Sequence, residues 1–125
     1  MVDRLAVGAG AIRLASGVSF LVVPERANAL WSADGADSPT ASLLLRSMGY
    51  RDALIGGLLL HAGLRRPATV SGWFLASAGA DLADLIGGIA NHDRLSGRSR
   101  IMGIGGAAAG VAIGAAGAMR AAARR

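Results

Sequence analysis

The sequence predicts an all-α protein, an antiparallel bundle of four transmembrane helices, and three observations lead to this fold class. Hydrophobic residues make up 53% of the 125 residues and charged residues only 17%, whereas about 25% of a soluble domain is charged. The charges gather in short clusters that separate apolar stretches of about 20 residues, the length that crosses a hydrocarbon core of about 30 Å. Many of the 19 glycines lie inside these stretches, where small residues let membrane helices pack closely.

The first predicted helix covers residues 5–23 and is apolar apart from Arg13 and two serines. A proline and the charged pair Glu25-Arg26 end it. A cleaved signal peptide is the alternative for this segment, because the stretch Ala-Asn-Ala at 27–29 resembles a cleavage site. The two charged residues so close to that site argue against cleavage.

The second and third helices are predicted over residues 39–64 and 67–90. A serine followed by a proline at 38–39 is typical of a helix start, since serine caps the helix and proline fits its first position. Two arginines close the second helix, and a proline opens the third directly after them. Because this connection is so short, the two helices should form an antiparallel hairpin.

The fourth helix is predicted over residues 101–119, which carry no charge. A polar, basic loop at 91–100 precedes it and a basic tail at 120–125 follows it. A second polar loop, at 31–37, joins the first two helices. The domain is therefore a single integral membrane unit over residues 1–125.

The distribution of arginine favours an inner (plasma) membrane protein with both chain ends on the cytoplasmic side, because arginine is enriched there. In that orientation six arginines lie inside and four outside. The inner group is Arg4, Arg65, Arg66, Arg120, Arg124 and Arg125; the outer group is Arg26, Arg94, Arg98 and Arg100.

Ionisable residues inside the predicted helices form a candidate intramembrane charge layer: Arg13, Arg46, Arg51, Asp52, Asp81 and Asp84. At a rise of about 1.5 Å per residue, Arg46 lies at the outer interface of the membrane. The same rise places Arg51, Asp52, Asp81 and Asp84 about 4–10 Å below that interface. The long side chain of Arg13 can reach this layer from nearer the membrane centre. Two interpretations stay open. The layer is either a charge-paired belt that fixes helix register, or a polar site for a headgroup, a proton or a partner's charge.

Glycines recur along the fourth predicted helix and give it small residues on several faces. Those spaced by four residues form two overlapping GxxxG motifs, which favour close helix packing. The packing is either within the bundle or against another protein, and the surplus of small faces favours a partner. The candidate face consists of Gly103, Gly106, Gly110, Gly114 and Gly117.

Motifs for catalysis, metals and nucleic acids are missing. The net charge is +5, but the arginines form no long basic run interleaved with aromatic residues, so nucleic acid is not an expected partner. There is no cysteine, and His61 and His92 fall on opposite sides of the membrane. The glycine-rich stretch 103–106 lacks the lysine of a phosphate-binding loop. We expect no enzymatic activity, no metal and no cofactor.

The run from Arg46 to Leu60 is the most distinctive part of the sequence. Its pattern R-x-x-G-x-R-D-x-x-x-G is followed by a short basic turn and then D-x-x-D. Arg46, Gly49, Arg51, Asp52 and Gly56 match the first part, and Asp81 and Asp84 match the second. Over residues 5–118 the chain resembles a family of small bacterial four-helix membrane proteins of unknown function. The chain is rich in arginine and alanine, which suggests a high-GC genome such as that of an actinobacterium. With its small size, this composition also suggests an accessory subunit of an Mce-type lipid importer.

Three function classes follow from these patterns. The favoured one is a non-catalytic accessory subunit that docks on a larger membrane complex, such as a lipid ABC-type importer, through its Gly/Ala faces. The second is a small carrier or lipid-binding protein that uses the Arg/Asp layer. The third is a membrane enzyme acting on a lipid or quinone, with the aspartates as acid or base.

Overall fold

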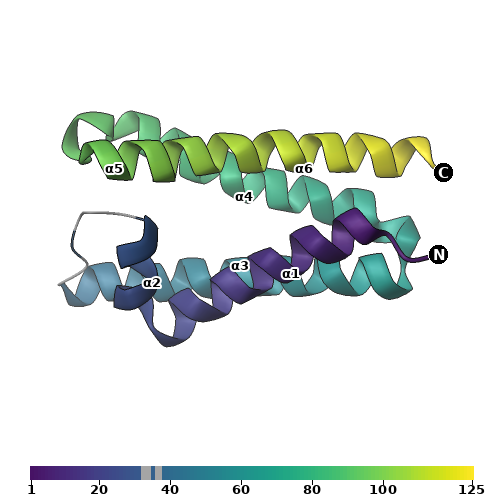
Figure 1. The fold of residues 1–125 in the computed structure, drawn as a ribbon, viewed down its shortest axis with the longest axis horizontal. Helices are drawn as coiled ribbons and strands as arrows, with labels where there is room; N and C mark the ends of the chain where they lie inside the picture. The colour runs from purple at the N-terminus through teal and green to yellow at the C-terminus, as the bar shows by residue number, and fades with distance from the viewer. Residues whose placement is uncertain (32–34, 36–37) are drawn as a thin grey trace.

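The computed structural model describes residues 1–31, 35 and 38–125, and all regular secondary structure in these residues is helical. Long helices run side by side along the molecule, and both chain ends lie at the same end of it (Figure 1). The helices are α1 (Arg4–Val22), α2 (Pro24–Trp31), α3 (Pro39–Arg65), α4 (Val70–Ala90), α5 (Gly97–Ser99) and α6 (Gly105–Ala123), with 3₁₀ turns η1 (Pro67–Thr69) and η2 (His92–Arg94) and a π-helical turn η3 (Arg100–Ile104).

The all-α fold class is confirmed, but the count of four membrane-spanning helices is not matched in full. Among the described residues, three helical segments are long and apolar enough to cross a membrane: Arg4–Val22, Pro67–Ala90 and Gly97–Ala123. Helix α3 has 27 residues, but its arginines, its aspartate and His61 make it more polar than the others. The length and composition of three of the four long helices therefore indicate a membrane protein.

The predicted end of the first helix before Pro24 is confirmed to within one residue, since α1 ends at Val22. A short helix that was not predicted, α2, begins at Pro24, because proline is well suited to the first turn of a helix. The predicted loop 91–100 ends early, because Ser96 caps a new helical segment by accepting a hydrogen bond from the Ser99 N–H at 3.3 Å. This segment continues through η3 and α6 as far as Ala123, beyond the predicted end at 119. Most of the predicted loop 31–37 lies outside the described residues.

Helices α1 and α3 pack antiparallel with their backbones in direct contact. Glycines from the two helices face each other in two places, Gly10 with Gly56 and Gly17 with Gly49. A methyl group placed on Gly10 would lie 2.5 Å from the backbone nitrogen of Leu60, and one on Gly49 would lie 2.7 Å from the carbonyl oxygen of Gly17. No side chain fits between the two helices there, so glycine is what permits the contact.

Helices α4 and α6 form the second antiparallel pair. Glycines of α6 face larger residues of α4 here, with Gly114 against Ala78 and Gly117 against Phe74. The Ser71 hydroxyl also donates a 3.0 Å hydrogen bond to the carbonyl oxygen of Ala118. Interhelical hydrogen bonds of this kind stabilise membrane helix pairs.

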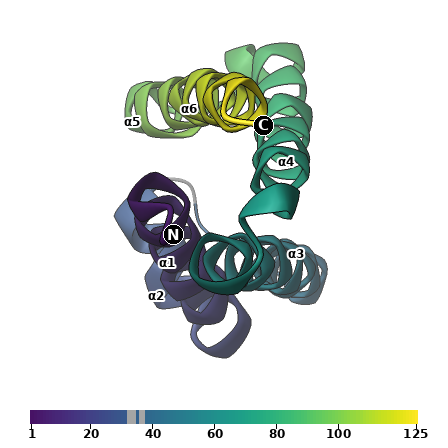
Figure 2. The same ribbon diagram turned by 90° about the vertical axis from the view of Figure 1, so that its right-hand side faces the viewer.

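The two helix pairs meet along α3 and α4, while α1 and α6 stand apart on the opposite side (Figure 2). A buried cluster at the end that carries the termini joins all four long helices; it contains Ala6, Leu59, Ala62, Val70, Phe74, Ala118 and Ala121. At the same end the Arg120 guanidinium of α6 pairs with both oxygens of Asp3, at 2.7 and 2.8 Å. The molecule is thus closed at this end.

Candidate ligand site between the helix pairs

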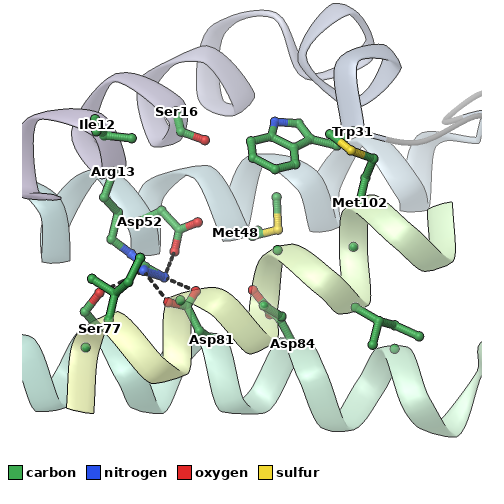
Figure 3. Close-up of a pocket in the computed structure, with 18 of the residues that line it drawn as sticks. Ile12, Arg13, Ser16, Trp31, Met48, Asp52, Ser77, Asp81, Asp84 and Met102 are labelled. Atoms are coloured by element: carbon green, nitrogen blue, oxygen red, sulfur yellow. Dashed lines mark hydrogen bonds and ion pairs between the residues drawn. The ribbon is translucent and has the colours of Figure 1, made fainter. Parts of the chain in front are cut away.

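A cavity of about 470 Å³ lies between the α1/α3 pair and the α4/α6 pair. Pockets that hold small molecules usually have volumes of about 300–1,000 Å³. Its lining is mostly apolar, with ionisable side chains at one end. In Figure 3 Arg13, Asp52, Ser77 and Asp81 gather at that end, while Trp31, Met48 and Met102 gather at the other. The cavity therefore has an apolar part and a charged part.

Arg13 connects the two helix pairs at the charged end. Its guanidinium reaches from α1 to α4, where it donates to the two carboxylate oxygens of Asp81 at 2.6 and 3.0 Å and to the Ser77 hydroxyl at 2.8 Å. It also lies 3.5 Å from the Asp52 carboxylate of α3. The Arg13 and Asp81 side chains are only 14% and 15% exposed. An arginine that donates to both oxygens of a carboxylate fixes the distance and the orientation of the two groups. This contact therefore helps to fix the position of the α1/α3 pair relative to the α4/α6 pair.

A second arginine makes a parallel connection closer to the surface. Arg51 of α3 donates to both oxygens of Asp84 of α4, at 3.1 and 2.9 Å, and its Nε donates to Asp52 at 3.1 Å. Its side chain is 33% exposed and that of Asp84 is 38% exposed. Asp52 thus lies between the two arginines and links the two ion pairs into one cluster.

This Arg/Asp cluster, made of Arg13, Arg51, Asp52, Asp81 and Asp84, holds two guanidinium groups and three carboxylates. With every group ionised it carries one excess negative charge. A charge in hydrocarbon is expensive unless it is neutralised. The cluster therefore favours an additional positive charge or proton nearby.

The sixth residue of the predicted charge layer stands apart from the cluster. Arg46 donates a 2.9 Å hydrogen bond from its guanidinium to the carbonyl oxygen of Leu21, near the end of α1. A cation there is favourable because the last carbonyls of a helix carry partial negative charge. Arg46 lies near the connection between α1 and α2, on the same helix as Arg51 but away from the cavity.

The predicted glycine face of the fourth helix is divided by the structure. Gly110, Gly114 and Gly117 pack against Asp81, Ala78 and Phe74 of α4, inside the molecule. Gly106 faces Trp31 across the cavity at an ordinary contact distance, and a methyl group on Gly103 would meet nothing within 4 Å. Both of these glycines line the cavity, and so do Gly110 and Gly114. The glycines of η3 and α6 therefore serve packing and cavity shape together.

Sequence reasoning missed several residues of this site. Ser77 lies one helical turn before Asp81, so the spacing of four residues that places both on one face was a usable signal. The π-helical turn η3 contributes Met102, Gly103 and Ile104 to the cavity wall. Turns of this type are rare and are frequently found at functional sites, but no pattern in the sequence indicates one.

The cavity opens toward the side of the bundle. Ile12 of α1 and Ile113 of α6 line it from opposite walls and are 74% and 54% exposed. Exposed aliphatic side chains on a membrane-spanning helix are compatible with lipid tails, so this opening suits entry from the bilayer. No group of three or more potential metal ligands occurs among the described residues.

A family model for a domain of unknown function, DUF4267, matches residues 10–120. The chain belongs to the DUF4267 family. The match includes every residue of the Arg/Asp cluster and the glycines at which α1 meets α3. Neither a curated protein nor a solved structure matches the chain. This membership agrees with the resemblance to an uncharacterised family and carries no activity with it.

Proposed function

We propose that this DUF4267 protein is a non-catalytic membrane protein that binds one amphiphilic molecule between its two helix pairs. The apolar part of the ligand would occupy the end of the cavity near Trp31, Met48 and Met102. Its polar group would meet the Arg/Asp cluster. The observation that carries the proposal is the cavity of about 470 Å³ with apolar walls and charged residues at one end.

Three further features support this function. The cavity opens between exposed apolar side chains, which suits a molecule that arrives from the bilayer. The ionisable residues are held by well-formed ion pairs, so the polar end is arranged before a ligand enters. Intramembrane ionisable residues are functional candidates by default, because they are costly to retain.

The same proposal includes the topology. We propose that α3 crosses the membrane with α1, α4 and α6, its charged residues shielded by the cluster, and that both chain ends face the cytoplasm of an inner (plasma) membrane. Both ends lie at one end of the molecule (Figure 1), as an even number of crossings requires. Reporter fusions at the two ends should then report the same, cytoplasmic side; opposite sides would contradict four crossings.

Filling the cavity tests the binding function. Gly103→Phe places a ring on a residue that lines the cavity, and the added side chain meets no atom within 4 Å at its Cβ. Gly105→Phe makes the same change two residues further, where the Cβ is equally unhindered but the residue does not line the cavity. Both proteins, purified in mild detergent, would be extracted and their bound lipophilic molecules identified by mass spectrometry.

The expected result is that the parent and Gly105→Phe retain a molecule in stoichiometric amount and that Gly103→Phe loses it. Circular dichroism and size-exclusion chromatography would show that both variants are folded. Equal retention in the two variants, or no retained molecule in the parent, would argue against the proposed function.

A second candidate is an accessory subunit that docks on a larger complex, such as a lipid importer. It is favoured by the outer side of α4, where Gly72, Gly79 and Gly87 have nothing within 4 Å of an added methyl group. A small residue that faces lipid contributes little packing, whereas a small residue that faces another helix allows that helix to approach closely. Co-purification of stoichiometric larger subunits, lost in Gly79→Leu and kept in Gly103→Phe, would favour this function over ligand binding.

A further inference from the structure

We infer that the polar group of the ligand is a cation, such as a primary or quaternary amine on an apolar chain. This inference rests on the proposed function and names its ligand class. It follows from which atoms of the Arg/Asp cluster are already engaged and which remain free to meet a ligand.

Of the two arginines of the cluster, Arg13 lines the cavity and Arg51 does not. The Arg13 Nη1 donates to both Ser77 and Asp81, and its Nη2 donates to Asp81 and lies 3.5 Å from Asp52. The Nε of Arg13 has no partner among the described residues, but it is buried beyond the reach of a ligand. A phosphate or carboxylate headgroup would therefore have to displace an existing ion pair.

A carboxylate oxygen, by contrast, remains available. Asp52 uses its Oδ1 to accept from Arg51 at 3.1 Å and to approach Arg13 at 3.5 Å. Its Oδ2 accepts no hydrogen bond from the described residues, and it is not among their buried unpaired atoms. Figure 3 shows this second oxygen directed away from Arg13. Asp52 lines the cavity, so Oδ2 is placed to meet a ligand.

The charge of the cluster leads to the same ligand class. Three carboxylates and two guanidinium groups leave one negative charge uncompensated in a low-dielectric site, where an opposite charge interacts much more strongly than in water. A ligand cation near Asp52 would neutralise the cluster. An anionic ligand would raise the excess to two negative charges.

The aromatic residue at the cavity allows this to be measured. Trp31 lines the cavity, and the only other tryptophan of the sequence is Trp73, so the Trp73→Phe chain carries one reporter. Single-chain amphiphiles with the same 12-carbon, bromine-labelled tail would be titrated into this protein in an uncharged maltoside detergent. The three probes carry a trimethylammonium, a carboxylate or a hydroxyl group, and quenching of Trp31 reports binding.

We expect the ammonium probe to bind about tenfold more tightly than the carboxylate probe, a difference of about 1.4 kcal/mol. Asp52→Asn should bring the ammonium-to-carboxylate ratio close to one while leaving the hydroxyl probe bound, which also shows that the variant is folded. Asp93→Asn is the matched control, because it removes the same charge from a side chain in the connecting segment that is 87% exposed. This control should retain the parent's ratio.

The outcomes separate the two proposals. Equal binding of all three probes, or a ratio that Asp52→Asn leaves unchanged, would overturn the cationic ligand class and leave an amphiphile-binding function standing. Tighter binding of the carboxylate probe would overturn it in the same way. If no probe quenches Trp31, the proposed function itself fails, and the ligand class with it.

Discussion

The two arginine–aspartate pairs of the cluster differ mainly in burial. Arg13 and Asp81 are about 15% exposed, whereas Arg51 and Asp84 are more than twice as exposed. Removing one partner of a largely buried pair leaves an uncompensated charge with little access to water, and that cost is much larger than the value of the pair itself. The two arginines should therefore respond very differently to the same substitution.

We predict that Arg13→Gln lowers the free energy of unfolding by about 3–5 kcal/mol, the usual cost of breaking a buried pair. Arg51→Gln should cost about 1 kcal/mol or less, because exposed pairs contribute little. Unfolding in mixed maltoside and dodecyl sulfate micelles, followed by circular dichroism, measures both. The double variant Arg13→Gln/Asp81→Asn should recover part of the loss. Equal costs for the two arginines would contradict this account.

The sequence predicted that most residues of the Arg/Asp cluster lie at one depth, but it did not predict which arginine pairs with which aspartate. The depth of each residue follows from counting along a helix of known rise, which placed Arg51, Asp52, Asp81 and Asp84 together. Which arginine meets which aspartate depends on how each helix is rotated about its axis. That rotation is set by packing against several neighbours at once, and a single helix sequence does not contain it.

At the scale of the helices, the backbone contact between α1 and α3 has no tolerance for added volume. A methyl group on Gly17 would lie 2.6 Å from the carbonyl oxygen of Gly49. An obstructing side chain can change rotamer, whereas backbone atoms move only if the whole helix moves. Gly8 lies on the same helix, and a methyl group there meets nothing within 4 Å.

We predict that Gly17→Ala destabilises the protein by about 1–3 kcal/mol, the cost typical of an overpacked interior. Gly8→Ala should be neutral or slightly stabilising, since alanine is the better helix former by about 1 kcal/mol. The same micelle unfolding assay compares the two variants. A neutral Gly17→Ala would mean that the two helices stand further apart than described here.

The glycine patterns were only partly informative at this scale. The four-residue repeat in α6 indicated close packing, and two of its three glycines, Gly110 and Gly114, do pack against α4. The stronger contact uses glycines seven residues apart, Gly10 and Gly17 on α1 and Gly49 and Gly56 on α3. A spacing of seven also keeps residues on one helix face, so the signal was present. Which two helices share such a face is a tertiary property, and it was not predicted.

At the scale of the whole molecule, Asp3 and Arg120 tie the beginning of α1 to the last turn of α6. Asp3 also caps α1 by accepting a 3.1 Å hydrogen bond from the Ala6 N–H. Burial by itself would raise the pKa of the Asp3 carboxyl, but this hydrogen bond and the Arg120 guanidinium outweigh it, and the net pKa lies below the usual value. The folded state therefore holds the ionised form more firmly than the unfolded chain does.

We predict that this contact stabilises the protein fully above the pKa of an unfolded aspartate, about 3.9. Its contribution is lost as the pH falls through the lower pKa of the folded state, because both states then bind the same proton. Asp3→Asn should lower stability at pH 7 and remove that part of the acid dependence. Unfolding curves of the two proteins between about pH 7 and pH 2 should converge at the acid end; curves that stay parallel would contradict the assignment.

The order of elements and the all-α architecture were within reach of the sequence, because long apolar runs and their charged ends mark membrane helices directly. The division into two helix pairs with a cavity between them was not. It arises because glycine lets α1 approach α3, and α6 approach α4, more closely than the pairs approach each other. A cavity is the space left where neighbouring helices do not pack against each other, and the sequence of one helix does not reveal it.

The division into pairs also bears on how the protein is made. Every residue of the α1/α3 pair precedes Pro67, and every residue of the α4/α6 pair follows Arg66. During synthesis the first hairpin can enter the bilayer and close its glycine contacts before the second hairpin has left the ribosome. Only the last step, when Asp81 and Asp84 arrive opposite Arg13 and Arg51, joins the halves. Until then the first hairpin has one carboxylate of the cluster, Asp52, for two arginines, so the time it spends with an excess positive charge is set by how quickly translation supplies the other aspartates.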